Sequence, residues 1–139
     1  TDADPLLHDL LLAKLQDALR TSETPLAGEV RRAILALLQG GACSRAAVAD
    51  HIGLHPRTLG RRLQSLGLSF QGLFDETRRE LAEHLLRDTA APVARVATAV
   101  GYRDSTVFTR AFKRWTGGTP GEFRGGPAGR PGSGVASGR

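Results

Sequence analysis

The chain has a single cysteine, Cys43, and no methionine among its 139 residues. One cysteine cannot form a disulfide within the chain or supply a zinc site built from several cysteines, so we expect a reducing, cytoplasmic location. The absence of methionine, including at position 1, fits either a fragment of a longer protein or the removal of an initiator methionine before Thr1.

Long apolar runs are also missing. No run approaches the roughly 18 residues that a membrane-spanning helix needs, and the N-terminus has neither the basic start nor the apolar core of a signal peptide. We therefore expect no membrane association. A hydrophobic content of 40% is enough for one domain, or two very small ones, with a modest core.

Lysine is scarce in the region that carries the positive charge. The chain has 19 basic and 14 acidic residues, and after residue 40 Lys113 is the only lysine. Arginine suits phosphate and guanine recognition because its planar guanidinium donates two parallel hydrogen bonds. A GC-rich genome would produce the same preference for arginine, so the charge alone does not decide the function.

Two segments about 48 residues apart repeat one pattern. Ala49 lies four residues before Gly53, and Ala97 lies four residues before Gly101. The residues that follow the glycines also correspond: Leu59, Arg61 and Leu63 in the first segment, and Phe108, Arg110 and Phe112 in the second. A short apolar helix, a glycine turn and a second helix form a helix-turn-helix, so the repeat predicts two DNA-reading helices.

The remaining pattern is helical, and no segment shows the sustained alternation of a strand, so the expected fold class is all-α. Ser44, Ser69, and Asp104 or Ser105 are placed to cap helices. The expected helices cover 6–19, 29–38, 44–52, 56–66, 69–88, a segment from 92 to the break at Gly101, 105–115, and a last turn at 120–123. The helix that Ser69 caps, about 18 residues ending near Asp88 and so roughly 27 Å long at 1.5 Å per residue, would connect the two repeats.

These signals divide the chain into three parts: an N-terminal helix and connector (1–28), a domain at 29–124, and a tail at 125–139. The domain would hold a first helix-turn-helix at about 44–66, a linker helix at about 70–88 and a second helix-turn-helix at about 92–115. The tail is rich in Gly, Pro, Ser and Ala, and we expect it to be disordered. The leucine-rich N-terminal helix could belong to the domain core, end a missing effector-binding domain or form a dimer surface. We favour packing, because its broad apolar face would otherwise be exposed.

The outward faces of the two second helices are polar and basic. The residues expected to pack inward are Leu59, Leu63 and Leu66 in the first helix and Phe108, Phe112 and Trp115 in the second. Opposite them, the first helix presents Arg57, Gly60, Arg61 and Gln64, and the second presents Thr106, Thr109, Arg110 and Lys113. Arginines and short polar side chains near a helix N-terminus suit major-groove reading. A single arginine on such a face is more often a solvated charge, but the match of Arg61 to Arg110 favours DNA reading.

Several of these segments together resemble a known family. The segment 48–124 resembles the DNA-binding domain of the AraC/XylS family of bacterial transcription regulators, most clearly in PRTLGRRLQSLGLSF at 56–70, VATAVGYRDSTVFTRAFKRWTGGTP at 96–120 and EFR at 122–124. The resemblance implies seven helices in two homeodomain-like helix-turn-helix subdomains joined by a long helix. Two departures stand out: Tyr102 lies where the family usually has Phe, and Gly60 lies where a base-reading side chain is common.

The resemblance also implies the site residues and the function. The base-reading set is Arg57, Arg61, Ser105, Thr106, Thr109 and Arg110, and the set at phosphates or the edges of the reading faces is Thr58, Arg62, Gln64 and Lys113. The implied function is sequence-specific transcription regulation, most often activation, with double-stranded DNA as the partner. RNA polymerase is a further candidate partner, and an effector-binding domain would be missing from this chain.

Other readings of the sequence fit less well. Cys43, His51 and His55 lack the spacing of a zinc site, and one cysteine cannot supply the cysteine-dependent DNA-repair module found in some relatives of this domain. No catalytic triad, carboxylate pair or phosphate loop stands out, so we expect no enzyme activity, no metal and no cofactor. The competing function is a helical module that binds only acidic protein surfaces, and salt-dependent binding to duplex DNA would distinguish the two.

Overall fold

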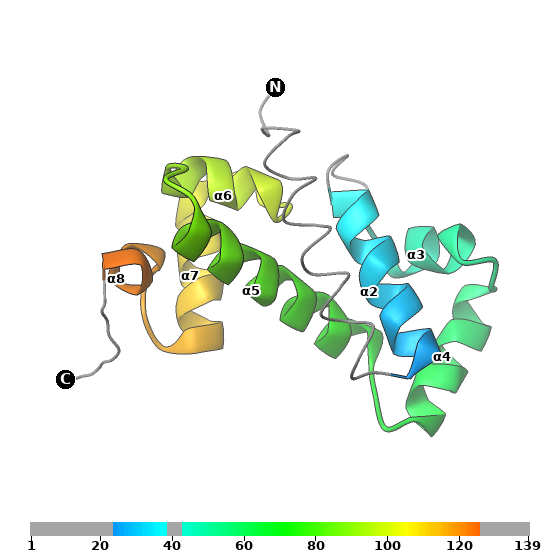
Figure 1. Ribbon diagram of the computed structural model, residues 1–139. Coiled ribbons are helices and arrows are strands. Elements are labelled where there is room, and N and C mark those ends of the chain that lie inside the picture. The colour runs from blue at the N-terminus through cyan, green and yellow to red at the C-terminus, as the bar shows by residue number, and fades with distance from the viewer. Residues whose placement is uncertain (1–23, 39–42, 126–139) are drawn as a thin grey trace.

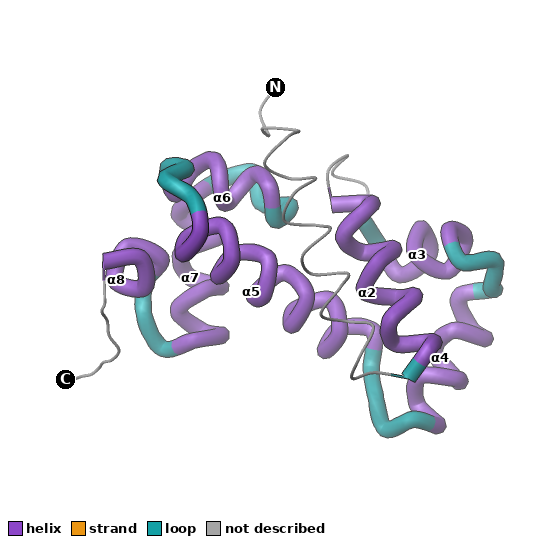
Figure 2. The backbone as a smooth tube through the Cα atoms, in the orientation of Figure 1, coloured by secondary structure: helices purple, strands orange, loops and turns teal. Residues whose placement is uncertain are grey.

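The computed structural model describes residues 24–38 and 43–125, and within these ranges all regular structure is α-helical (Figures 1 and 2). The helices are α2 (Pro25–Leu38), α3 (Arg45–His51), α4 (Pro56–Ser65), α5 (Phe70–Asp88), α6 (Val93–Ala99), α7 (Ser105–Thr116) and α8 (Pro120–Gly125). The expected all-α fold is confirmed. The leucine-rich helix at 6–19 and the tail from residue 126 lie outside the described residues. No helix in the described ranges is long and apolar enough to cross a membrane.

Two expected boundaries were wrong. The helix expected from Glu29 begins at Pro25, because the backbone N–H of Ala27 donates to the Thr24 hydroxyl (3.3 Å) and the fixed φ of proline suits a first turn. At the other end, Gly125, expected to begin the disordered tail, is the last residue of α8.

The caps of the other helices follow the sequence signals. The Ser44 hydroxyl accepts from the backbone N–H of Ala47, and the Ser69 hydroxyl accepts from that of Gly72, each at 3.0 Å. Asp104, and not Ser105, caps α7, because its carboxylate accepts from the N–H of Thr106 at 2.7 Å. Each cap satisfies a backbone donor that has no partner inside its helix, so these residues fix where the helices start.

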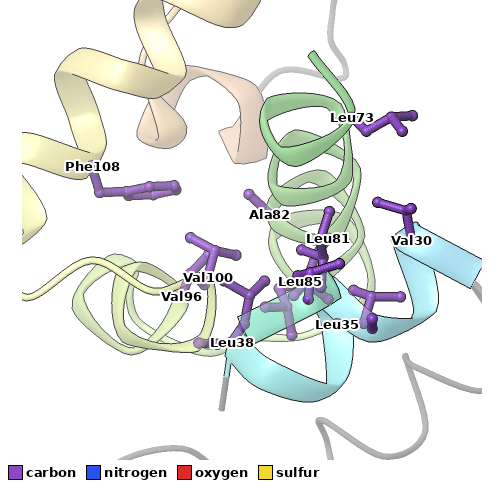
Figure 3. Close-up of a cluster of buried hydrophobic side chains, with 14 of the residues drawn as sticks. Val30, Leu35, Leu38, Leu73, Leu81, Ala82, Leu85, Val96, Val100 and Phe108 are labelled. Carbon is purple, nitrogen blue, oxygen red and sulfur yellow. The ribbon is translucent and has the colours of Figure 1, made fainter. Parts of the chain in front are cut away.

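The helices form two lobes around α5. Helices α2, α3 and α4 lie on one side and α6, α7 and α8 on the other, while α5 runs between them (Figure 1). Apolar side chains from α2, α5 and α6 meet in one buried cluster that includes Val30, Leu35, Leu81, Leu85 and Val96 (Figure 3). The long helix is therefore part of a core that both lobes share, and this core fixes the two lobes relative to each other.

Two ion pairs from the buried side chain of Arg31 join α2 to the same helix. The Arg31 side chain is 9% exposed; its Nη1 lies 3.0 Å from Glu80 Oε1, and its Nη2 also contacts Glu76 Oε1. Because both carboxylates belong to α5, the two pairs fix the position of α2 along that helix.

Candidate nucleic-acid interface

The two helix-turn-helix units have the same turn. Gly53 and Gly101 adopt positive φ angles of 82° and 91°, a region that favours glycine because it has no Cβ. In the first unit the backbone N–H of Leu54 donates to the carbonyl of Ala49 at 2.8 Å, and in the second that of Tyr102 donates to Ala97 at 2.9 Å. The repeat seen in the sequence is therefore a repeat of backbone geometry.

Helix α4 is the second helix of the first unit. The His55 Nδ1 accepts from the backbone N–H of Arg57 at 3.1 Å and caps the helix, and Pro56 takes the first helical position. Leu59 and Leu63 are fully buried and anchor one side of the helix. Of the residues proposed from the sequence, four are exposed and Thr58 is half-buried; the exposed ones are Arg57, Arg61, Arg62 and Gln64.

Helix α7 is the corresponding helix of the second unit. Phe108 and Phe112 are fully buried, and their rings lie 5.8 Å apart between centroids. Of the proposed residues, only Thr109 is half-buried; the exposed ones are Ser105, Thr106, Arg110 and Lys113. The outward faces expected from the helical periodicity are thus exposed, except at Gly60 and Thr109, which are half-buried. Leu66, expected to pack inward, is exposed because it follows the last residue of α4.

The cations on these faces have no counter-ion in the part of the chain that the structure describes. Among the described residues, no carboxylate oxygen lies within ion-pair distance of Arg57, Arg61, Arg62, Arg110 or Lys113. Arginines on α5 differ: Arg78 pairs with Asp75 at 3.0 Å, and Arg79 pairs with Glu83 at 3.1 Å. The positive charge on α4 and α7 is therefore available to an external anion, while that on α5 is partly neutralised within the fold.

Tyr102 keeps the packing role of the phenylalanine that the family usually has. Its ring lies 5.7 Å from that of Phe108 and 6.2 Å from that of Trp115, and the Arg78 guanidinium lies 4.6 Å from its centroid. Burial raises the pKa of the Tyr102 hydroxyl, with Arg78 acting in the opposite direction. This departure leaves the aromatic cluster beneath α7 intact.

Sequence reasoning missed Val107, which is 48% exposed on α7 between Thr106 and the buried Phe108. An apolar side chain beside a reading face can contact a thymine methyl group. The periodicity contained the signal, because Val107 falls outside the inward positions marked by Phe108 and Phe112.

No metal site accompanies this surface within the described ranges: no three His, Cys, Asp or Glu side chains are grouped so that they could hold an ion. Cys43 lies just before α3, and burial raises the pKa of its thiol to about 11, an effect that Arg78 partly offsets. The thiol is thus protonated at neutral pH.

With this geometry in place, comparison with known proteins decides the family. Residues 48–126 match the helix-turn-helix domain family, more than half of the chain. The chain belongs to the AraC/XylS-type helix-turn-helix transcription regulators. It is 34% identical over 130 residues to the regulator VirS of Mycobacterium tuberculosis, covering 92% of this chain and 38% of VirS. It is 35% identical over 125 residues to the arabinose operon regulatory protein of Escherichia coli, covering 87% and 43%.

The fold of the chain is also similar to that of a solved DNA-binding domain. The crystal structure of the DNA-binding domain of AdpA, a global transcriptional factor solved in complex with a target DNA, aligns with a TM-score of 0.60 and 29% identity. The alignment covers 73% of this chain and 91% of that domain. The chain spans less than half the length of the two full-length relatives.

Proposed function

We propose that this chain is the DNA-binding part of a transcription regulator and that it reads two successive major-groove segments, one with α4 and one with α7. The observation that carries the proposal is the pair of exposed faces centred on Arg61 and Arg110, whose guanidinium groups have no carboxylate partner among the described residues. The DNA complex of the similar AdpA domain supports it. Two recognition helices on one polypeptide do what a helix-turn-helix dimer does with half-sites about 34 Å apart, so the target site is asymmetric.

The proposed contacts fall into two classes. Side chains near the centre and N-terminal end of each reading face contact bases, since a recognition helix approaches base edges with its first turns. These are Arg57, Arg61, Ser105, Thr106, Thr109 and Arg110. Side chains at the edges of the faces contact the phosphate backbone and hold the helices in the groove. These are Thr58, Arg62, Gln64 and Lys113.

The proposal includes an organisation for the whole chain. The DNA-binding domain runs from α2 to α8, residues 25–125, because the expected bounds of 29 and 124 fall inside these two helices. The fact that the chain covers only 38% of VirS and 43% of the arabinose regulator supports an effector-binding domain elsewhere in the full protein. We place the regulator in the cytoplasm, with activation through RNA polymerase as its mode of action and no catalytic step.

Footprinting tests this function directly. A duplex selected by the 139-residue chain from a random DNA pool is treated with a cleavage reagent with and without protein. We expect two protected major-groove segments, one helical turn apart on one face, and binding that weakens steeply with salt because arginine contacts release counter-ions. Protection of a single segment would mean that one lobe does not read DNA. Binding without salt dependence or sequence preference would favour the protein-interaction module instead.

A further inference from the structure

Gly60 is an unusual residue for its place in the fold. It lies inside α4, between Arg57 and Gln64 on the flank of the reading face, and its φ is not positive, so the backbone does not require glycine. A glycine inside a helix destabilises it relative to alanine, because glycine loses more backbone freedom when the chain folds. A Cβ built on Gly60 would have only one neighbouring group within 4 Å, so packing within the protein does not exclude a side chain either.

That neighbouring group is the guanidinium of Arg45. Arg45 is the first residue of α3, and its Nη1 lies 4.0 Å from the position that a Gly60 Cβ would occupy. The guanidinium therefore lies over the part of α4 that carries no side chain. Arg45 is exposed, and none of the carboxylates in the described residues forms an ion pair with it.

The second lobe has different residues at the positions that correspond to Arg45 and Gly60. The first residue of α6, which corresponds to Arg45, is Val93, and the residue of α7 that corresponds to Gly60 is Thr109. Where the recognition helix has its own side chain, the preceding helix therefore begins with an uncharged residue. Where the recognition helix has none, an arginine from the preceding helix lies over the gap.

We propose that Arg45 is a base-reading residue of the first lobe: its guanidinium takes the place on the reading surface that a side chain at position 60 would fill. This inference rests on the proposed DNA-binding function. It assigns one base contact of the first half-site to α3, where the proposed function assigns all of them to α4. It also replaces the missing contact that Gly60 implies in the sequence. The preferred partner is a guanine, whose O6 and N7 accept the paired hydrogen bonds of a guanidinium.

Four single variants of the 139-residue chain test this proposal, together with one double variant that combines Arg45→Ala with Gly60→Gln. The single variants are Arg45→Ala, Arg45→Lys, Gly60→Gln and Gly60→Ala. Binding is measured by fluorescence anisotropy on a duplex selected by the wild-type chain and on a scrambled duplex of the same composition. We expect Arg45→Ala to weaken binding to the selected duplex about 5- to 100-fold and to affect the scrambled duplex much less. Arg45→Lys should not restore the preference, because an ammonium group lacks the planar fork.

The Gly60 variants show whether the two residues act together. Gly60→Gln places a long side chain where the guanidinium lies, so Arg45→Ala in that background should cost about twofold or less. Gly60→Ala is the matched control, since a methyl group at 4.0 Å from Nη1 leaves the guanidinium in place and the DNA preference unchanged. Circular dichroism and thermal melting establish that each variant is folded; both residues lie on the surface of the lobe, and we expect wild-type spectra.

The remaining outcomes overturn the proposal in different ways. If Arg45→Ala weakened both duplexes equally and reduced the salt dependence, Arg45 would hold a phosphate and read no base. If it changed neither, Arg45 would not touch DNA, although Arg61→Ala would still report on the proposed function. If the wild-type chain showed no preference between the duplexes, the proposed function would fall, and this inference with it.

Discussion

The Nε–H of Arg124 in α8 donates to the backbone carbonyl of Leu86 in α5 at 3.0 Å. The same guanidinium donates to the carbonyl of Thr89 at 3.1 Å, to that of Leu85 at 3.3 Å, and to that of Ala91. Leu86 lies in the last turn of α5, whose carbonyls carry partial negative charge, and Thr89 and Ala91 lie in the segment that follows the helix. A cation with several donors suits a place where carbonyls from a helix end and a loop converge. Arg124 therefore fastens α8 to the end of α5 and closes the second lobe.

Replacing Arg124 should destabilise the fold. Arg124→Ala leaves several carbonyls without their charged donor, and we expect a loss of about 2–3 kcal/mol in the free energy of unfolding, measured by urea denaturation. Arg124→Lys should recover little of this stability, because a single ammonium group cannot donate to all four carbonyls that the nitrogens of the planar guanidinium contact. Arg95→Ala, an exposed arginine of α6, serves as the control and should change stability by less than about 0.5 kcal/mol. Equal effects of Arg124→Ala and Arg95→Ala would show that the carbonyl contacts contribute nothing.

The two turn glycines should respond unequally to alanine. Gly53→Ala places a Cβ in the left-handed region but meets nothing within 4 Å, so we expect a loss of roughly 1–2 kcal/mol. Gly101→Ala has the same backbone strain, and its Cβ would also lie 3.0 Å from Leu38 Cδ2 in the core, which adds about 1–3 kcal/mol. Thermal melting should rank Gly101→Ala below Gly53→Ala.

Gly60→Ala is the control for Gly53→Ala and Gly101→Ala, because it should raise the stability of the protein where they lower it. Its backbone is helical, and alanine should stabilise the protein by roughly 0.5–1 kcal/mol. A ranking with Gly53→Ala as the least stable variant would mean that the approach of Gly101 to Leu38 is not a constraint on the fold.

Much of this architecture follows from local signals that the sequence contains. Glycine at a left-handed turn and serine at an N-cap act through their own backbone, so Gly53, Gly101, Ser44 and Ser69 were predictable. Contacts between distant elements were not. No local pattern shows that Arg124 reaches the carbonyls of α5 or that Arg31 is buried against Glu76 and Glu80, because these depend on how the helices pack.

The candidate site also has features that the local sequence predicts and features that depend on how the helices pack. The exposed faces around Arg61 and Arg110 follow from helical periodicity alone, and the structure places both residues there. Arg45 could not be associated with Gly60 from the sequence, since the two residues belong to different helices and meet only across the turn. Periodicity identifies which side of a helix faces outward, but it does not show what a neighbouring helix places beside it.

The buried thiol of Cys43 should make stability fall at high pH. The folded-state pKa is raised to about 11, whereas in the unfolded chain the thiol ionises at its ordinary, lower pKa. The stabilisation is therefore fully present below the ordinary pKa and is lost as the pH rises through the folded value. Urea unfolding at pH 8 and at pH 10.5 should show a larger loss of stability for the wild type than for Cys43→Ala. Because the Tyr102 pKa is also raised, some loss should remain in the variant, and identical losses would argue against a perturbed thiol.

Base-reading and phosphate-holding residues should separate in a single experiment. Arg61 and Arg110 are exposed on α4 and α7, and we propose that they read bases. Arg61→Ala and Arg110→Ala should therefore each cost about 1–3 kcal/mol on the selected duplex and relax the preference at one or two base pairs. Arg62 and Lys113 lie toward the edges, so their alanine variants should weaken the selected and scrambled duplexes similarly and flatten the salt dependence by about one unit of slope each. Affinities measured for all four variants on both duplexes at several salt concentrations distinguish the two classes. If Arg61→Ala and Arg110→Ala weakened both duplexes equally, their assignment to base reading would be wrong even though the protein binds DNA.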